Sequence, residues 1–194
     1  MEPKADAFKN IILAKYYKDT QVPIRGKSCT AQQIPSLKEK FTTYDAFANA
    51  GLKDIFGEGL NTSLHFKATE FRSGIFINQG DNHYSFKAFS NEAQIAPINS
   101  ILYEDFDGDQ KKDLLMAGNN YMPEVETTRA DAGKGIFYKG DANGAFKYID
   151  NNSTGLFTDK DVRKMLLLKS KEGKNIFIAN NNSKHQLFRV KNNN

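Results

Sequence analysis

Two stretches of the chain, residues 74–89 and 135–149, share one pattern of apolar and polar positions. In each, a run that begins Gly-Ile-Phe is followed by a cluster of Gly, Asp and Asn, and then by a second run that is rich in aromatic residues. Two such runs joined by residues that favour tight turns are typical of a β-hairpin. We therefore predict a hairpin in each stretch.

The two hairpins belong to a longer repeat with a spacing of about 61–62 residues. Residues 100–120 align with residues 162–182, so that Leu114-Leu115-Met116-Ala117 falls over Ile176-Phe177-Ile178-Ala179. Each repeat then offers about four strands with turns between them, which is typical of a β-propeller blade. Two runs that are apolar on successive residues indicate strands covered on both faces: Ile101-Leu102-Tyr103 and Met165-Leu166-Leu167-Leu168.

We therefore expect a mainly β protein with propeller-type four-stranded blades, present as a partial propeller or a fragment of one. Residues 1–194 are expected to form one domain or fragment. Its expected parts are a strand plus a helical insertion over 1–60, a partial blade over 61–98, a blade over 99–160 and a terminal partial blade over 161–194. Because open blades leave unpaired strand edges, we expect either a C-terminal segment of a longer parent chain or a small protein whose N-terminal elements cover those edges.

Residues 31–57 show a different period. Apolar side chains recur there at steps of three and four residues, which is typical of an amphipathic helix. These residues are Ile34, Leu37, Phe41, Tyr44, Phe47, Ala48, Leu52 and Ile55. Thr42 or Thr43 suits a helix N-cap, and Gly57 suits a helix end. We predict one or two short helices with the apolar stripe facing the core; a stripe that binds a partner is the alternative.

Composition argues against several classes of function. The net charge is only +4 and the lysines are mixed with acidic residues, so no basic stripe indicates nucleic acid as a partner. The lone cysteine, Cys29, cannot form an internal disulfide, and the three histidines, His65, His83 and His185, lie in no recognisable catalytic motif. No apolar run approaches the ~20 residues needed to span a bilayer, and the first residues do not resemble a signal peptide.

Residues 105–113, DFDGDQKKD, carry the clearest candidate chemistry. Aspartates occupy relative positions 1, 3, 5 and 9, and Gly108 occupies position 4. Alternate carboxylates on a tight loop can converge on one Ca²⁺, and glycine permits the turn. Because four carboxylates at close range repel one another unless a cation neutralises them, the pattern favours calcium over a plain Asx-rich turn. The flanking apolar runs place the loop between two strands, where an ion would have a structural role.

The second copy of the repeat does not preserve this pattern. The aligned pairs are Asp107 with Lys169, Asp109 with Lys171 and Asp113 with Asn175. Lysines at these positions would repel a divalent cation, so we expect a site only in the first copy. Residues 141–144 contain too few acidic side chains for a second site and are predicted to form a hairpin turn.

Several stretches resemble the C-terminal part of bacterial FG-GAP/VCBS repeat proteins, which occur in large predicted envelope proteins. The likeness covers nearly the whole chain. It is carried by residues 103–109 running into Asp113-Leu114-Leu115, by residues 91–94 with 97–99, by residues 129–132 with Gly135, and by the helical stretch 37–56.

The resemblance implies a propeller related to integrin α-chain repeats, with calcium in a loop between two blade strands. Matched position by position, it implies side-chain ligands from Asp105, Asp107, Asp109 and Asp113 and a backbone carbonyl ligand from Lys111. The chain departs from the usual pattern at Gln110, where glycine is common.

We expect a calcium-binding, non-enzymatic module for adhesion or for interaction with a protein or glycan partner, in an extracellular, periplasmic or outer-membrane-associated protein. The residues that would bind such a partner stay open. A second hypothesis is a carbohydrate-active enzyme, or its accessory domain, with a site on the long polar loop 119–134. Its candidate residues are Tyr121, Glu124, Glu126, Arg129 and Asp131. A third is a purely structural segment that caps a larger propeller.

Overall fold

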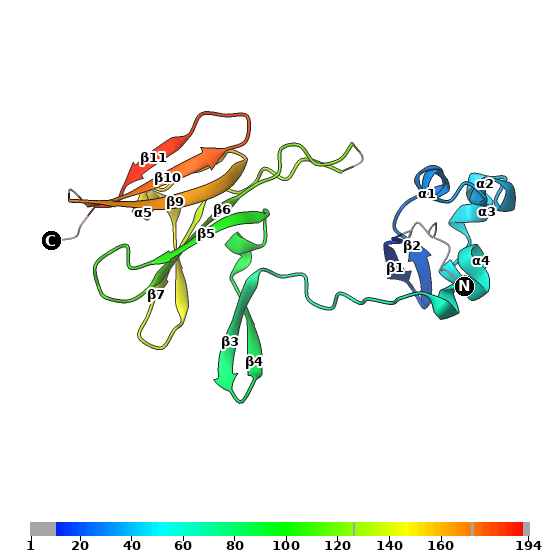
Figure 1. The fold of residues 1–194 in the computed structure, drawn as a ribbon, viewed down its shortest axis with the longest axis horizontal. Coiled ribbons are helices and arrows are strands. Elements are labelled where there is room, and N and C mark those ends of the chain that lie inside the picture. Colours follow the sequence, from blue (N-terminus) through cyan, green and yellow to red (C-terminus); the bar gives the residue numbers. More distant parts are fainter. Residues whose placement is uncertain (1–10, 126, 172, 192–194) are drawn as a thin grey trace, which may run out of the picture. The chain divides into compact units, whose positions relative to one another are not determined.

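The structure is a computed structural model that describes residues 11–125, 127–171 and 173–191 (Figure 1). Its named strands form four antiparallel sheets of two to four strands, and the sheets of the described residues do not close into a barrel. The expectation of a mainly β fold is confirmed. The chain divides into two compact units, residues 1–69 and 70–194, where the sequence led us to expect a single domain.

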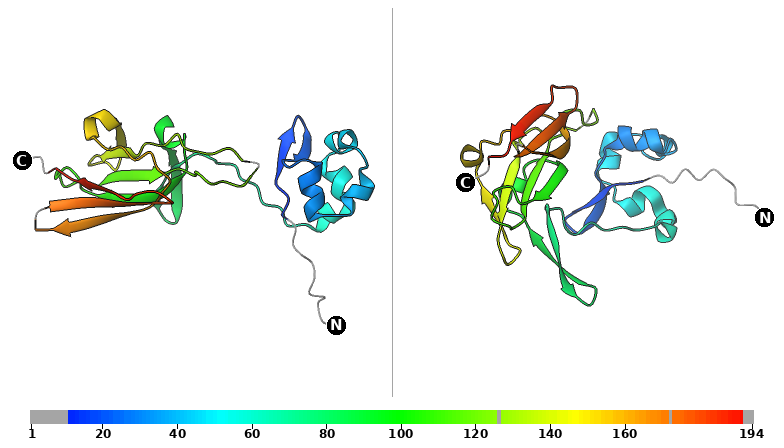
Figure 2. Two further views of the ribbon diagram at one scale, coloured as in Figure 1. Left: turned by 90° about the horizontal axis from the view of Figure 1, so that it is seen from above. Right: turned by 60° about the vertical axis from the view of Figure 1, so that its left-hand side comes forward.

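The first unit combines one hairpin with short helices (Figure 2). Strands β1 (Ala14–Tyr17) and β2 (Thr20–Pro23) pair in register, with Ala14 opposite Pro23. The helices that follow are α1 (Lys27–Gln33), α2 (Leu37–Lys40), α3 (Tyr44–Ala48) and α4 (Leu52–Phe56), and the 3-10 helix η1 (Gly57–Thr62) comes last. The predicted helical stretch is therefore helical, but it is broken into more and shorter helices than we expected.

The apolar stripe of this stretch is buried by the helices themselves. Leu37, Phe41, Phe47 and Ile55 of the stripe form one buried cluster with Ala31 and Ala50, whereas Tyr44 of the stripe is exposed. The rings of Phe41 and Phe47 meet edge to face, with their centroids 5.5 Å apart. Thr43 caps α3 by accepting a hydrogen bond from the Ala46 amide, as the sequence predicts. The helices therefore bury their own stripe within a compact unit that also contains the β1–β2 hairpin.

The second unit begins with a hairpin and continues into a four-stranded sheet. The hairpin consists of β3 (Gly74–Gly80) and β4 (His83–Ala88), and the short helix η2 (Asn91–Ala93) follows it. The sheet has the sequential order β5-β6-β7-β8. Its strands are β5 (Ile98–Glu104), β6 (Asp113–Gly118), β7 (Ile136–Gly140) and β8 (Phe146–Ile149). Both hairpins that the repeat predicts, β3–β4 and β7–β8, are therefore present.

A three-stranded sheet completes the second unit. After α5 (Asn151–Thr154), the strands β9 (Val162–Ser170), β10 (Gly173–Asn180) and β11 (Gln186–Arg189) pair in the order β11-β10-β9. This sheet lies beside the β5–β8 sheet (Figure 1), and the Met165 amide of β9 donates a hydrogen bond to Ser100 Oγ of β5 at 2.8 Å. The two sheets therefore make specific contact through strands β5 and β9.

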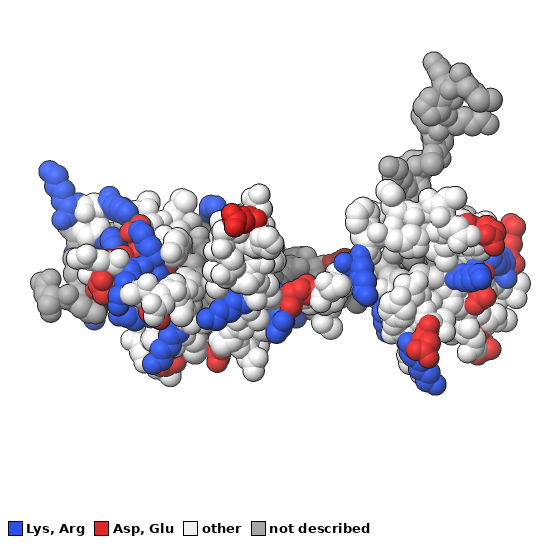
Figure 3. All heavy atoms as spheres, turned by 90° about the horizontal axis from the view of Figure 1, so that it is seen from below, with Lys and Arg blue, Asp and Glu red and all other residues white. Residues whose placement is uncertain are grey.

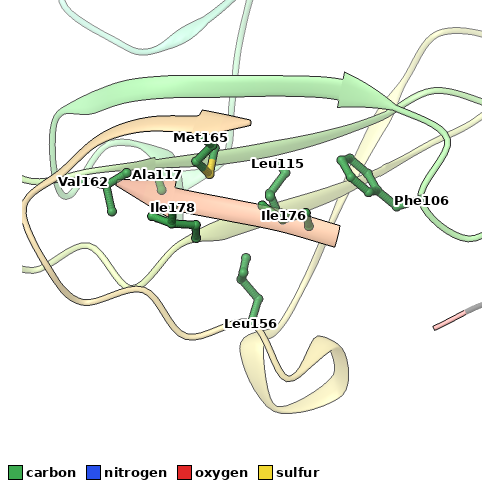
Figure 4. Close-up of a cluster of buried hydrophobic side chains, with 8 residues drawn as sticks. All are labelled: Phe106, Leu115, Ala117, Leu156, Val162, Met165, Ile176 and Ile178. Carbon is green, nitrogen blue, oxygen red and sulfur yellow. The ribbon is translucent and has the colours of Figure 1, made fainter. Parts of the chain in front are cut away.

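Strand β6 lies at the centre of this unit, and all of its residues are buried. Leu115 and Ala117 contribute to a cluster that joins β6 to β9 and β10, shown in Figure 4. Leu114 and Met116 point to the opposite face and pack in a second cluster with Ala93, close to η2. The successive apolar residues of β6 therefore belong to a strand that is covered on both faces.

The predicted coverage on both faces is wrong for the apolar runs of β5 and β9. In β5, Ile101 is 56 % and Tyr103 60 % exposed. Met165 is buried, whereas Leu166 and Leu168 are each 47 % exposed. Alternate side chains of a strand point to opposite faces of its sheet, and only one face of the β9–β11 sheet packs against the β5–β8 sheet. An apolar run therefore does not by itself show that both faces of a strand are covered within the chain.

Candidate metal centre

The predicted acidic loop, residues 105–112, joins β5 to β6. Phe106 anchors this loop by inserting its ring into the apolar cluster between the two sheets (Figure 4), where it meets Phe137 at 6.0 Å. Phe106 is buried, whereas Asp105, Asp107 and Asp109 on either side of it are only half-buried. The carboxylates of Asp105, Asp107 and Asp109 gather with oxygens within 4.8 Å of one another, the spacing of a candidate metal site.

The three aspartates also order the loop through its own backbone. Asp105 accepts hydrogen bonds from the amides of Gly108 at 2.7 Å and Gln110 at 3.0 Å. Asp107 accepts from the Asp109 amide at 3.2 Å, and Asp109 accepts from the Lys111 amide at 2.9 Å. Gly108 and Gln110 both have positive φ, 85° and 67°. The predicted turn therefore contains two residues with left-handed backbone conformation. One is the predicted glycine, Gly108, and the other is Gln110, which adopts this conformation although it is not glycine.

A lysine that the sequence analysis missed neutralises this cluster. The Lys139 ammonium, from the neighbouring strand β7, contacts Asp107 Oδ2 and lies 3.1 Å from Asp109 Oδ2. These two carboxylates raise the pKa of Lys139. The pKa of Asp109 is lowered, first by the Lys111 amide and then by Lys139. The Lys139 ammonium thus occupies the position where a cation would offset the repulsion between the clustered carboxylates.

Asp113 has a different role from the other three aspartates. Its carboxylate is fully buried and accepts the backbone amides of Phe106 and Gly140, each at 3.0 Å. Burial is the main cause of its raised pKa, which the two amide hydrogen bonds counteract. A Cβ on Gly140 would lie 2.0 Å from the Lys112 carbonyl oxygen, so glycine is required for this close approach. Asp113 therefore fastens the loop to β7.

The remaining predicted ligand, Lys111, lies at the edge of the cluster. Its amide donates to Asp109, and its side-chain nitrogen lies 3.7 Å from Asp109 Oδ2. Of the five predicted metal residues, the structure therefore gathers the carboxylates of Asp105, Asp107 and Asp109, while Asp113 and Lys111 act through the hydrogen bonds that shape the loop.

A second charged group ties the loop to the next sheet. Glu104, the last residue of β5, pairs with Lys112 at 3.2 Å and with Lys169 of β9 at 3.0 Å. Hydrogen bonds from Lys169 and Lys112 lower the pKa of Glu104 from its ordinary 4.5 to about 2. Lys174 of β10 donates to the Asp105 carbonyl and lies 3.9 Å from Glu104. The lysines of the degenerate repeat copy therefore bind the acidic loop of the first copy.

The donor set suits a hard cation. Carboxylate oxygens are preferred ligands of Ca²⁺, which takes six to eight oxygens and tolerates irregular geometry. Asp105, Asp107 and Asp109 would hold such an ion, and bound Ca²⁺ would supply the positive charge that Lys139 supplies here. The Lys139 side chain is 42 % exposed, so its flexible stem has room to move away when an ion binds.

The long loop 119–134 is organised around Asn119, which is fully buried. The Asn119 amide donates to the carbonyls of Gly133 and Lys160, and its oxygen accepts the Gly133 amide at 2.9 Å. Near the same end, Arg129 lies over the Tyr121 ring at 3.6 Å and pairs with Asp131 at 2.9 Å. Three candidate residues of the enzyme hypothesis are thus together and bind one another.

The enzyme hypothesis also involves two carboxylates, those of Glu124 and Glu126, and the structure describes only the first. Glu124 accepts a hydrogen bond from Thr127 at 2.7 Å, and Glu126 lies outside the described residues. Cys29 lies in the first unit, half-buried, where the Arg25 guanidinium donates to its sulfur at 3.5 Å. His185 stacks on Phe177 at 5.3 Å. Cys29 and His185 lie in different units of the chain.

Charged side chains of both signs are interspersed on the face drawn in Figure 3. The helices of the described residues are short, and none has the length and apolar character required to cross a membrane.

Comparisons with protein-family models, with curated proteins and with solved structures find no match.

Proposed function

We propose that residues 70–194 form a calcium-stabilised, non-enzymatic β-propeller-type module of the FG-GAP/VCBS class. One consideration in favour is the sequential antiparallel order β5-β6-β7-β8, because a propeller blade is a four-stranded meander of this kind. The β9–β11 sheet follows with the same strand order and packs against the first, in the manner of a neighbouring blade.

The observation that carries the proposal is the convergence of Asp105, Asp107 and Asp109 around the Lys139 ammonium. Carboxylates this close destabilise the fold unless a positive charge compensates them. Lys139 supplies one charge, and a bound Ca²⁺ supplies two together with direct coordination. The ion would then fix the connection between β5 and β6, so its role is structural.

The module would serve adhesion or interaction with a protein or glycan in an extracellular or envelope setting. This part of the proposal depends on the resemblance to FG-GAP/VCBS repeats. We prefer it to the carbohydrate-active enzyme, because Tyr121, Arg129 and Asp131 bind one another and so brace the long loop.

The test is thermal unfolding of metal-stripped protein with and without millimolar Ca²⁺. A ligand that binds only the folded state must raise the unfolding midpoint. We expect Ca²⁺ to raise the midpoint of the wild type and to leave that of an Asp107→Asn, Asp109→Asn variant unchanged. The matched control is Asp141→Asn, which removes a carboxylate from the β7–β8 turn and should keep the full response to Ca²⁺. A wild-type unfolding midpoint that does not change on addition of Ca²⁺ would refute the structural role of calcium.

A further inference from the structure

A small hollow opens between the base of the β3–β4 hairpin and strands β7 and β8. Its volume is about 110 Å³. This is room for roughly one six-membered ring, since an apolar cavity of ~150 Å³ accommodates benzene. Its wall includes four aromatic and two polar side chains, those of Phe89, Tyr138, Phe146, Tyr148, Lys87 and Ser90. We call this hollow the aromatic pocket.

The rings of the aromatic pocket support one another. Phe89 stacks on Tyr138 with the ring centroids 5.0 Å apart, and Phe146 meets Phe89 edge to face at 6.4 Å. Tyr148, opposite Tyr138 on the neighbouring strand, meets its ring at 6.0 Å. Tyr138 is only 2 % exposed, whereas the other three residues are half-buried. The pocket therefore offers a fixed aromatic wall to a ligand.

The hydroxyl groups of the pocket have their hydrogens engaged within the protein. Ser90 donates to the Glu92 carboxylate, so the Tyr138 hydroxyl donates in turn to Ser90 Oγ at 2.7 Å. Tyr148 donates to Asn151 Oδ1 at 3.3 Å, because the Asn151 nitrogen already donates to backbone carbonyls. All three hydroxyl oxygens keep acceptor capacity, so a ligand that fits them must bring its own hydrogen-bond donors.

The charges around the pocket favour a neutral ligand. Among the described lining residues Lys87 alone is charged, and it would repel a cation. Glu92 lies behind Ser90, and after burial its negative charge is the next cause of the raised pKa of Tyr148. An anion would therefore meet a carboxylate close to the pocket.

A sugar ring has the properties that the pocket requires. Its hydroxyl groups donate to the pocket oxygens and accept from the Lys87 ammonium, which is a donor only. Its C–H faces are apolar and fit an aromatic wall that carries a few polar groups. An apolar side chain of a protein partner would leave the oxygens and the ammonium without partners.

We propose that the aromatic pocket binds one neutral sugar residue of a glycan, with the ring against Phe146 and Tyr148 and a hydroxyl group accepting from Lys87. This inference rests on the function proposed above and names the site and the ligand class of its glycan form. Tyr103, which is 60 % exposed, meets Phe146 at 6.4 Å, so the aromatic surface continues beyond the pocket. The next sugar residue of the same glycan would lie against Tyr103.

The test is an NMR titration of the whole chain, in millimolar Ca²⁺, with glucose, galactose, mannose and N-acetylglucosamine. N-acetyl-leucinamide is the probe for an apolar side chain of a protein partner. Phe146→Ala removes part of the aromatic wall and Lys87→Met removes the donor. Their controls are Phe76→Ala, at a ring of β3 that is 70 % exposed and outside the pocket, and Lys147→Met. Lys147 follows Phe146 on β8, so strand alternation directs it to the opposite face.

We expect at least one sugar to shift the ring resonances of Tyr148 in the wild type and in both controls. Phe146→Ala and Lys87→Met should each weaken that binding about tenfold. Lys87 is exposed, so Lys87→Met keeps the test valid if Phe146→Ala does not fold.

Three results would overturn the proposal: sugars that shift no resonance of the pocket, sugar binding that is as tight in both pocket variants as in the wild type, and binding of N-acetyl-leucinamide in place of the sugars. The unfolding midpoint of the same wild-type sample with and without Ca²⁺ tests the calcium-stabilised module separately. A midpoint that rises with Ca²⁺ in a protein that binds no sugar would remove only the sugar site.

Discussion

The connections β5–β6 and β9–β10 occupy the same place in two successive sheets, and they differ in almost every respect. The first is the acidic loop 105–112, with its backbone bound by its own aspartates. In the second, β9 continues to Ser170 and β10 begins at Gly173, so the chain turns almost at once. Residues that form a loop in one copy therefore belong to strands in the other.

The comparison shows what happens when a repeat loses its acidic side chains. Lys169 aligns with Asp107, but it lies on an extended strand and reaches Glu104 of the neighbouring sheet. Lys174, near the start of β10, reaches the carbonyl of Asp105. Lys169, which replaces an acidic side chain, thus stabilises the strand end from which the acidic loop of the other copy begins. The acidic side chains of the first copy are therefore neutralised partly by its own Lys139 and partly by Lys169 of the second copy.

The largest expected loss of unfolding free energy distinguishes the two copies at Asp113. Asp113→Ala leaves the amides of Phe106 and Gly140 buried without an acceptor, so we expect a loss of about 3 kcal/mol of unfolding free energy. The aligned residue in the second copy is Asn175, and Asn175→Ala should cost less than about 1 kcal/mol. Urea unfolding of both variants measures the difference. Equal losses would contradict the role given to Asp113.

A smaller effect concerns the charge network at Glu104. The pKa of Glu104 in the folded protein is about 2, below its ordinary 4.5, so its charge stabilises the fold above about pH 4.5 and this contribution is lost as the pH falls toward 2. Because the lysines are partly solvated, we expect Glu104→Gln to cost only about 1 kcal/mol at pH 7. Between pH 4.5 and 2 the variant should lose less stability than the wild type.

Glu70→Gln is the control for that experiment. The pKa of Glu70 is also about 2, because Arg72 binds it, but the two residues are neighbours in sequence and both are solvated. Because Glu70 and Arg72 are two residues apart, the pair can also form in the unfolded chain, so the pKa of Glu70 should change little on unfolding and Glu70→Gln should leave the acid profile unchanged. An acid profile that responds equally to both substitutions would show that the cross-sheet position of Glu104 has no special importance.

Much of the second unit could be predicted from the sequence because it depends on local pattern. The hairpins β3–β4 and β7–β8 follow from apolar runs with Gly, Asp and Asn between them. The division of the chain could not be predicted in this way. The period of residues 31–57 shows that one side of the helices is buried, but it does not show that other helices of the same unit bury it.

The candidate site could likewise be predicted only in part. The spacing of Asp105, Asp107 and Asp109 correctly places three carboxylates together, because alternate acidic side chains on a tightly turned loop can converge. It could not distinguish Asp113, whose role depends on burial and on two distant amides. Nor could it find Lys139, which reaches the loop only because β7 pairs with β6.

The most direct test of the central claim is a calorimetric titration of Ca²⁺ into metal-stripped wild type, Lys139→Met and Lys139→Arg. If Lys139 supplies the charge that a bound ion would supply, the wild type must displace it to bind Ca²⁺. We therefore predict that Lys139→Met binds Ca²⁺ about tenfold more tightly than the wild type, and that Lys139→Arg, which keeps the charge, does not. Absence of Ca²⁺ binding to both the wild type and Lys139→Met, or equal affinities for the two, would contradict the account.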